Sequence, residues 1–292
     1  MRFKFSALSH LSRLFIVSCT LFLGVNSAIA APSIWESNYG NVLTDLTDTD
    51  DGNTEVDLSF LFNFAGTDYS NVFVGTNGGL QLGSLGDDDE IDYDTWDDLD
   101  EFYADGAPTL FPFNTDLSLN ATGTIHFNDF GDRAVFTWNE VGTFAEQEHL
   151  STFQTQLLSN GTIIFGYNGI LDGADEDLID SLDEGIVVGI SESDDNDPGP
   201  SNLSGGPFIS TATTIYEAWC YDEEDSCDNG EGATNDAFDL DMTNVIFTPL
   251  AEGGFTVSSI VSKSPEAVPE PTSLLGLAAV SLLGFLGRRK IS

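Results

Sequence analysis

Apolar side chains recur at every second position in several parts of this chain, and this period limits what the chain can fold into. Between positions 56 and 64 the alternating residues are Val56, Leu58, Phe60, Phe62 and Phe64. Because successive side chains of a β-strand point to opposite faces, this spacing predicts a strand with one buried face. The same alternation recurs at 133–138 and 152–158. The body of the chain is therefore predicted to be all-β.

Short turn motifs indicate how these strands connect. Asn77-Gly78 interrupts the apolar stretch 72–82, and Ser159-Asn160-Gly161 interrupts the stretch 152–167. Asn and Gly tolerate the positive φ angles of tight hairpins, so both stretches predict antiparallel hairpins, the first with a type I′ turn. The period leaves two architectures open, an antiparallel β-sandwich and a partly closed barrel. Further strands are expected at 185–190, 209–219, 244–247 and 255–261.

Long acidic loops separate the predicted strands. The largest, 86–106, has apolar side chains three and four positions apart, which favours a turn or two of amphipathic helix. These apolar residues are Trp96, Leu99, Phe102 and Tyr103. The other acidic loops are 48–53, 172–185 and 193–206.

The charge of the chain is extreme, with a formal net charge of −41 at pH 7. Of the basic residues, only Arg133 and Lys263 lie in the body. Binding to nucleic acid requires clustered Lys and Arg, so the composition excludes it, and anionic lipid would repel the body. Divalent cations, basic proteins and cation-bridged acidic polymers are the favoured partners, although solubility alone also accounts for such a charge.

The N-terminus has the three parts of a secretory signal peptide over residues 1–30. Basic residues precede the apolar run 14–25, and small residues follow it. Cleavage is predicted after Ala30, in a site formed by Ala28, Ala30 and the new N-terminus Ala31. A lipoprotein box ending at Cys19 is the alternative, but the apolar run continues past that cysteine.

Export also bears on the two cysteines of the body, Cys220 and Cys227. In an oxidising compartment, two cysteines this close are expected to form a disulfide that closes a short acidic loop. A reactive or metal-binding pair is the alternative, but no histidine stands nearby to complete such a site.

Two of the acidic loops are candidate calcium sites, because Ca²⁺ prefers carboxylate and carbonyl oxygens. Neither has the spacing of an EF-hand, and solvated turns are also rich in Asp and Asn. The candidate ligands are Asp48, Asp50, Asp51 and Asn53 around Gly52, and Asp194, Asn196 and Asp197 before Pro198-Gly199.

The C-terminus combines a short linker, 262–267, with an apolar span, 273–287. As a helix this span would rise about 22 Å, less than the roughly 30 Å of a bilayer hydrocarbon core. The tail 268–292 is therefore expected to form a short hydrophobic helix that anchors the chain only temporarily, with its basic end in the cytoplasm.

The sequence has no motif of known catalytic machinery. G-x-S-x-G and H-E-x-x-H are absent, and the body has only two histidines, His126 on a predicted strand and His149 in a predicted loop. We expect a non-enzymatic protein.

Several motifs in the predicted domain 31–261 resemble the nidogen-like (NIDO) extracellular domain. The similarity covers about 45–191 and implies an extracellular β domain. Two positions depart from the family pattern, because Asn114 stands where Trp is frequent and Gly79 where a bulkier residue is usual. The motifs are Phe60 to Tyr69, Asn77-Gly78 before a strand that ends at Gly83, Pro112 to Leu117, and the pairs Phe153-Gln154 and Asn160-Gly161.

The tail resembles the PEP-CTERM sorting signal, and this resemblance implies recognition and processing by a membrane exosortase. The residues concerned are Val268, Pro269, Glu270 and Pro271 before the apolar span, and Arg288, Arg289 and Lys290 after it. The resemblance implies export through the inner membrane of a Gram-negative bacterium that makes extracellular polysaccharide. It also implies a single-pass stage before processing, and a cell-surface or extracellular location afterwards.

Together these features predict an adhesive or biofilm-associated surface protein whose partners are extracellular polysaccharide or other surface proteins. Two alternatives stay open at this point. One is a secreted hydrolase of extracellular polysaccharide, and the other is a purely structural surface protein stabilised by calcium.

Overall fold

The computed structural model describes residues 34–86, 89, 91, 99–104, 106–119, 122–144, 147, 149–170, 185–219, 233–234 and 238–261. The regular secondary structure of these residues is almost entirely β-strand. The one helix in these described ranges is the short α1 (Asp100–Ala104). The all-β prediction is confirmed.

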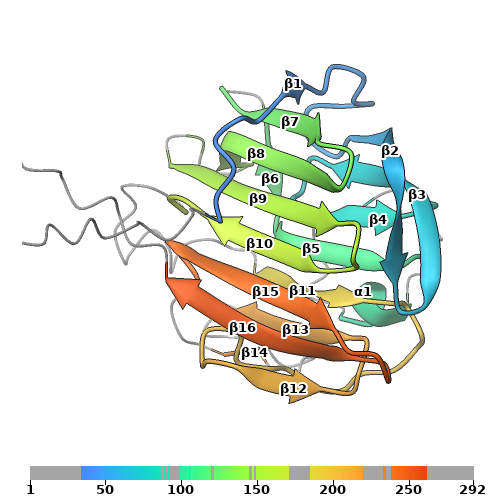
Figure 1. The fold of residues 1–292 in the computed structure, drawn as a ribbon. Coiled ribbons are helices and arrows are strands. Elements are labelled where there is room, and N and C mark those ends of the chain that lie inside the picture. Colours follow the sequence, from blue (N-terminus) through green and yellow to red (C-terminus); the bar gives the residue numbers. More distant parts are fainter. Residues whose placement is uncertain are drawn as a thin grey trace, which may run out of the picture. The chain divides into compact units, whose positions relative to one another are not determined.

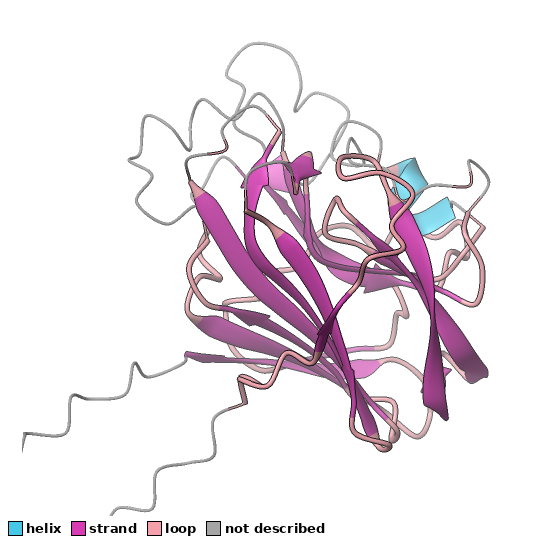
Figure 2. Cartoon of the chain, turned by 90° about the horizontal axis from the view of Figure 1, so that it is seen from above, coloured by secondary structure: helices cyan, strands magenta, loops and turns pink. Residues whose placement is uncertain are grey.

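Two β-sheets lie face to face, so the domain is a sandwich and not a closed barrel (Figures 1 and 2). In the nine-stranded sheet, here called sheet A, β6 (Leu117–Ser118) pairs with β8 off the main path. Its other strands lie in the order β1 (Asn41–Val42), β7 (Thr124–Asp129), β8 (Arg133–Thr143), β9 (Leu150–Leu158), β10 (Ile163–Tyr167), β15 (Thr243–Pro249), β16 (Phe255–Val261) and β12 (Phe208–Ser210).

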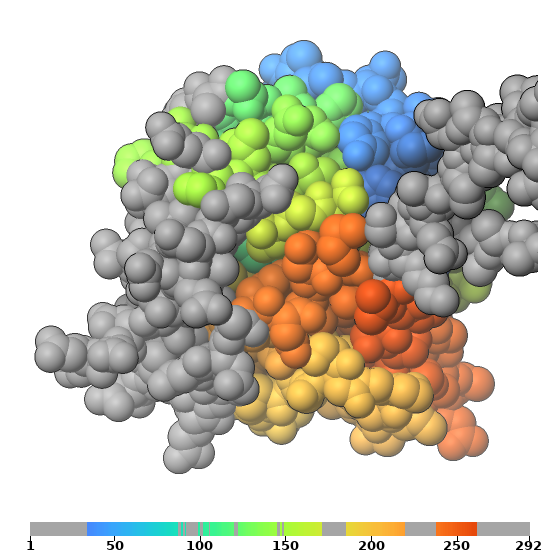
Figure 3. Space-filling model, turned by 90° about the vertical axis from the view of Figure 1, so that its left-hand side faces the viewer, coloured from blue at the N-terminus to red at the C-terminus, as the bar shows by residue number. Residues whose placement is uncertain are grey.

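The seven-stranded sheet, here called sheet B, is the second layer. Its strands lie in the order β14 (Ala233–Thr234), β13 (Ile215–Trp219), β11 (Ile186–Ser191), β5 (Thr109–Asn114), β4 (Leu80–Leu82), β3 (Thr67–Gly75) and β2 (Asn53–Phe64). Neighbouring strands are antiparallel in both sheets, apart from the parallel pair β13–β14. In Figure 3 the yellow-green surface of the β9–β10 region meets the orange surface of β15 directly, which shows how sheet A joins distant parts of the chain.

The predicted alternation puts the main core between the two inner faces. On β2, Val56, Leu58, Phe62 and Phe64 are buried and Phe60 is partly buried, as expected from the period of two. Within sheet A, the rings of Trp138 on β8 and Phe153 on β9, which are direct cross-strand partners, stack with their centroids 5.0 Å apart. These contacts bury apolar side chains, which favours folding.

Two aromatic side chains also hold the sheets together by hydrogen bonds across the core. The indole N–H of Trp138 on β8 donates to the backbone oxygen of Gly75, at 3.0 Å. The hydroxyl of Tyr167 on β10 donates to the backbone oxygen of Pro112 on β5, at 2.6 Å. Pro112 lies where the β5–β11 ladder shifts register, so its carbonyl accepts from the opposite sheet.

The described residues of the acidic loop 86–106 pack on the outer face of sheet B. The predicted helical turn is confirmed as α1, which buries Phe102 against Phe111 and Tyr216 at centroid distances of 5.3 and 5.7 Å. Sheet B therefore has packed apolar side chains on both faces.

The predicted type I′ turn at Asn77-Gly78 is wrong. The strands on either side pair as expected, but only Gly78 has a positive φ, of 79°. The Asn77 side chain is buried, where its oxygen accepts from the Leu117 N–H at 3.0 Å and its amide donates to the Asp51 carboxylate at 3.1 Å. Asn77 thus links its own turn to the loop at Asp51 and to the start of β6, and its backbone does not adopt the positive φ of a type I′ turn.

The expected strand at 209–219 is also wrong, because it is two strands in different sheets. β12 pairs with β16 in sheet A, and β13 pairs with β11 in sheet B. The Ala212 N–H donates to the Ser210 hydroxyl at 3.1 Å, which turns the chain away from the β12 ladder.

We predict that Tyr167→Phe destabilises the domain by about 1–3 kcal/mol, because the buried Pro112 carbonyl loses its donor. Burial also raises the pKa of Tyr167 well above its ordinary value. The free energy of unfolding of the wild type should therefore exceed that of the variant by its full amount below about pH 10. Above that pH the difference should shrink, because the tyrosine of the unfolded chain ionises. Urea unfolding of both proteins at pH 7 and pH 10.5 measures this.

Tyr39→Phe is the matched control for that experiment, because the Tyr39 hydroxyl has no hydrogen-bond partner among the residues that the structure describes. Equal losses in the two variants at pH 7 would contradict the role assigned to the bond between the sheets.

Candidate binding site

The segment 34–40, here called the N-terminal strap, crosses the outer face of sheet A before it enters β1 (Figure 1). Side chains of the sheet bind its backbone at successive positions. Gln156 donates to the oxygen of Ile34 at 2.7 Å, Gln154 exchanges two bonds of 3.1 Å with the N–H and oxygen of Glu36, and Asn128 donates to the oxygen of Asn38 at 2.8 Å.

The strap explains why two glutamines are buried on what would otherwise be an open face. Gln154 and Gln156 alternate with core residues on β9, as predicted, yet their exposed fractions are only 0% and 2%. Buried amides need hydrogen-bond partners, and the strap backbone supplies them. The outward direction of these side chains was predictable, whereas the segment that covers them was not.

An ion pair fastens the strap to sheet A. Arg133 on β8 and Glu36 on the strap approach to 2.7 Å. A hydrogen bond from the Asn38 backbone, together with the Arg133 guanidinium, lowers the pKa of Glu36. The cation closest to the strap is therefore already paired within the domain.

Tyr39, near the end of the strap, is held between two other rings. Its centroid is 6.1 Å from that of Trp35 and 5.7 Å from that of His126, both in edge-on geometry. Trp35 packs over Gly166, where an added Cβ would come within 3.2 Å of the indole ring. His126 lies on a strand as predicted, and burial lowers its pKa, which favours a neutral ring at pH 7.

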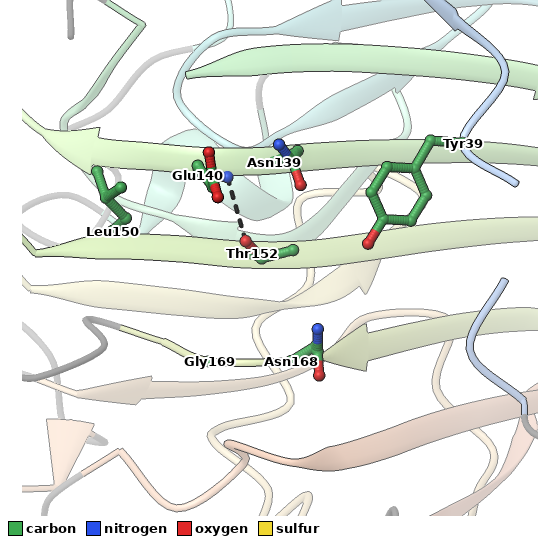
Figure 4. Close-up of a pocket in the computed structure, with 7 residues that line it drawn as sticks. All are labelled: Tyr39, Asn139, Glu140, Leu150, Thr152, Asn168 and Gly169. Atoms are coloured by element: carbon green, nitrogen blue, oxygen red, sulfur yellow. Dashed lines mark hydrogen bonds between the residues drawn. The ribbon is translucent and has the colours of Figure 1, made fainter. Parts of the chain in front are cut away.

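Beside Tyr39 lies a hollow of about 300 Å³ on the outer face of sheet A, here called the Tyr39 groove (Figure 4). Apart from Leu150 and the ring of Tyr39, the lining side chains are polar, and they come from the strap, β8, β9 and the chain after β10. The lining residues are Tyr39, Asn139, Glu140, Leu150, Thr152, Asn168 and Gly169.

A bulge in β8 shapes this groove. The β8–β9 register shifts between Trp138 and Val141, and Glu140 has a φ of 54°, which is rare for a residue other than glycine. The Glu140 N–H donates to the Thr152 hydroxyl at 3.1 Å. The bulge thus re-aims Asn139 and Glu140 and leaves the Thr152 proton free to donate.

Three polar side chains of the groove are available to a ligand. In the described part of the chain, the side chains of Asn139, Glu140 and Asn168 have no hydrogen-bond partner. Sequence reasoning missed this site, because Tyr39 is about a hundred positions away from the strands that complete it. The aromatic residues just after the predicted cleavage site were the one available signal.

The first predicted calcium loop is well ordered by its own hydrogen bonds. Asp48 accepts from the Thr49 N–H at 2.7 Å and from the Asp50 N–H at 3.2 Å, and Asp51 accepts from Asn77. Asp50 differs, since its buried Oδ1 has no hydrogen-bond partner. Burial and the neighbouring Asp51 and Asp48 raise the pKa of Asp50.

The last of the first group, Asn53, starts β2, and its amide approaches the Asp89 backbone oxygen at 3.5 Å. In the second loop, Asp197 accepts from the Gly199 N–H at 2.7 Å and from the Tyr216 hydroxyl at 2.9 Å. Its carboxylate therefore stabilises the turn at 197–199. Asp194 and Asn196 lie exposed beside it. No group of three or more His, Cys, Asp or Glu side chains in the described ranges is arranged to hold a metal. Calcium binding by either loop stays a prediction.

The remaining predicted sites lie outside the described residues. They are the signal peptide and its cleavage site, the pair Cys220 and Cys227, and the sorting signal from Val268 to Lys290. Within the residues that are described, no helix has the length and apolar character needed to span a membrane.

We predict that Asp50→Asn raises the melting temperature at pH 7 in EDTA. The pKa of Asp50 is raised in the folded state, so its ionised form costs stability above the unfolded pKa of about 4, and this cost disappears near pH 3. Millimolar Ca²⁺ should then stabilise the wild type and not the variant. Exposed Asp57 provides the control substitution, Asp57→Asn. If Ca²⁺ shifts the melting temperatures of all three proteins equally, or shifts none of them, the prediction that this loop binds calcium is wrong.

Comparison with protein families agrees with both resemblances. The model of the family described as NIDO related matches residues 29–219, well over half of the chain. The PEP-CTERM protein-sorting motif matches residues 267–290. Comparisons with curated proteins and with solved structures gave no match. The sorting motif is the recognition signal of exosortase, and the NIDO domain is extracellular, so this is an exported, exosortase-targeted surface protein. The chain belongs to the NIDO-related family.

Proposed function

We propose that the protein is a non-enzymatic adhesive component of the extracellular layer of a Gram-negative bacterium, associated with exopolysaccharide or with other surface proteins. The observation that carries the proposal is the pairing of a NIDO-related domain with a sorting motif at 267–290. The motif directs the chain to the surface, and the sandwich supplies a domain for contact there. The signal peptide starts export, and the tail holds the chain in the inner membrane until exosortase acts.

The chemistry of the Tyr39 groove favours binding over hydrolysis. Glycoside hydrolysis uses a pair of carboxyl groups that flank the scissile bond. Among the lining residues that the structure describes, Glu140 alone has a carboxylate. Amides and hydroxyls both donate and accept hydrogen bonds, which suits recognition of a polar ligand. Binding of a polymer, unlike its hydrolysis, therefore does not require a second carboxyl group in this groove.

We predict that tail processing depends on the Pro269-Glu270-Pro271 tripeptide and on an exosortase. Mass spectrometry of the surface-exposed protein should recover no peptide beyond the tripeptide region in a host with the enzyme. The double variant Pro269→Ala/Pro271→Ala, or deletion of the exosortase gene, should keep the tail and hold the protein in the inner membrane.

The linker substitution Ser264→Ala is a suitable control, because it lies ahead of the motif and leaves the tripeptide intact. Surface protein that still ends at Ser292 would contradict processing. Equal surface display of the tripeptide variant would contradict sorting by this motif.

A further inference from the structure

We propose that the Tyr39 groove binds one sugar unit of a neutral polysaccharide. The inference rests on the proposed association with an extracellular polymer, and it adds the site and the chemical class of the ligand. A pyranose ring presents apolar C–H groups on its faces and hydroxyls around its rim. Its binding site therefore needs an aromatic surface beside groups that both donate and accept hydrogen bonds.

The groove has both parts of such a site. Figure 4 shows Tyr39 extending from the strap toward the end of β10, with Asn139 and Glu140 on one side and Asn168 on the other. The two amides donate and accept, Glu140 accepts, and Thr152 donates its free proton. Together they suit a ligand with several hydroxyl groups.

The aromatic wall is preorganised. Tyr39 is fixed by its ring contacts with Trp35 and His126, and the strap behind it is fixed by Gln154 and Gln156. A side chain that is already ordered loses little conformational entropy when a ligand binds. The wall therefore needs no rearrangement to receive a ring.

The charge of the site selects a neutral polymer over an acidic one. The described lining includes the carboxylate of Glu140 and no Lys or Arg. Arg133, on the same sheet, is paired with Glu36. An anionic chain would also meet the field of a body whose formal charge is strongly negative.

The size of the groove suits a single unit of a longer chain. Its volume of about 300 Å³ is at the lower end of the ~300–1,000 Å³ typical of small-molecule sites. The hollow is open on the surface of the sheet, so the neighbouring units of a polymer can continue along the face.

The test is native affinity electrophoresis of the mature, processed protein through gels that contain dextran, galactomannan or alginate. We expect at least one neutral polymer to retard the wild type and alginate not to retard it. Tyr39→Ala and Asn168→Ala should each weaken the retarding interaction at least about tenfold. The exposed strap variant Ser37→Ala should stay within about twofold of the wild type.

Thermal melts of all variants separate loss of binding from loss of folding, and Asn168→Ala tests the site even if Tyr39→Ala is unstable. Three results would overturn the inference: no retardation by either neutral polymer, retardation by alginate alone, or neutral binding that both groove variants retain. In the last of these, association with polymer stands and only its assignment to the groove fails. The tail-processing experiment is independent of all three.

Discussion

Two buried glutamine amides on the outer face of sheet A determine how the N-terminal part of the domain is arranged. Gln154 and Gln156 lie where a two-layer sandwich would ordinarily meet water, and their burial requires partners. The strap backbone provides these partners at Ile34 and Glu36. Because the strap is fixed there, Tyr39 is placed beside the bulge of β8, and the groove exists.

The strap lies close in sequence to the predicted signal-peptide cleavage site. Its first described residue, Ile34, lies only a few positions after the predicted signal-peptide cleavage between Ala30 and Ala31. The described part of the folded domain therefore begins close to the predicted cleavage site. At the other end, β16 belongs to the same sheet and leads to the linker before the sorting tail.

Much of the fold was predictable because its strands follow a strict period of two. The β9–β10 hairpin and the core positions of β2 and β8 follow directly from apolar alternation. The wrong predictions occur where a polar side chain makes a specific hydrogen bond, because the apolar period contains no information about such bonds. Asn77 serves as a buried link between loops, and Ser210 turns the chain between two sheets.

The candidate site was harder to predict for the same physical reason. A groove formed by Tyr39, Glu140 and Asn168 depends on tertiary packing of distant segments, and a bulge is invisible in hydrophobic periodicity. Acidic loops were conspicuous in the sequence, yet Asp48 and Asp197 accept hydrogen bonds from backbone N–H groups of their own loops. The abundance of aspartate therefore gave no signal of the Tyr39 groove, whose described lining has one carboxylate.

Hydrogen–deuterium exchange of the mature protein tests most directly the claim that the strap completes the binding face. We predict slow exchange at the Glu36 amide, which donates to Gln154, and further slowing around 36–39 and 150–152 with a saturating neutral polymer. Fast exchange throughout the strap, unchanged by the polymer, would contradict it.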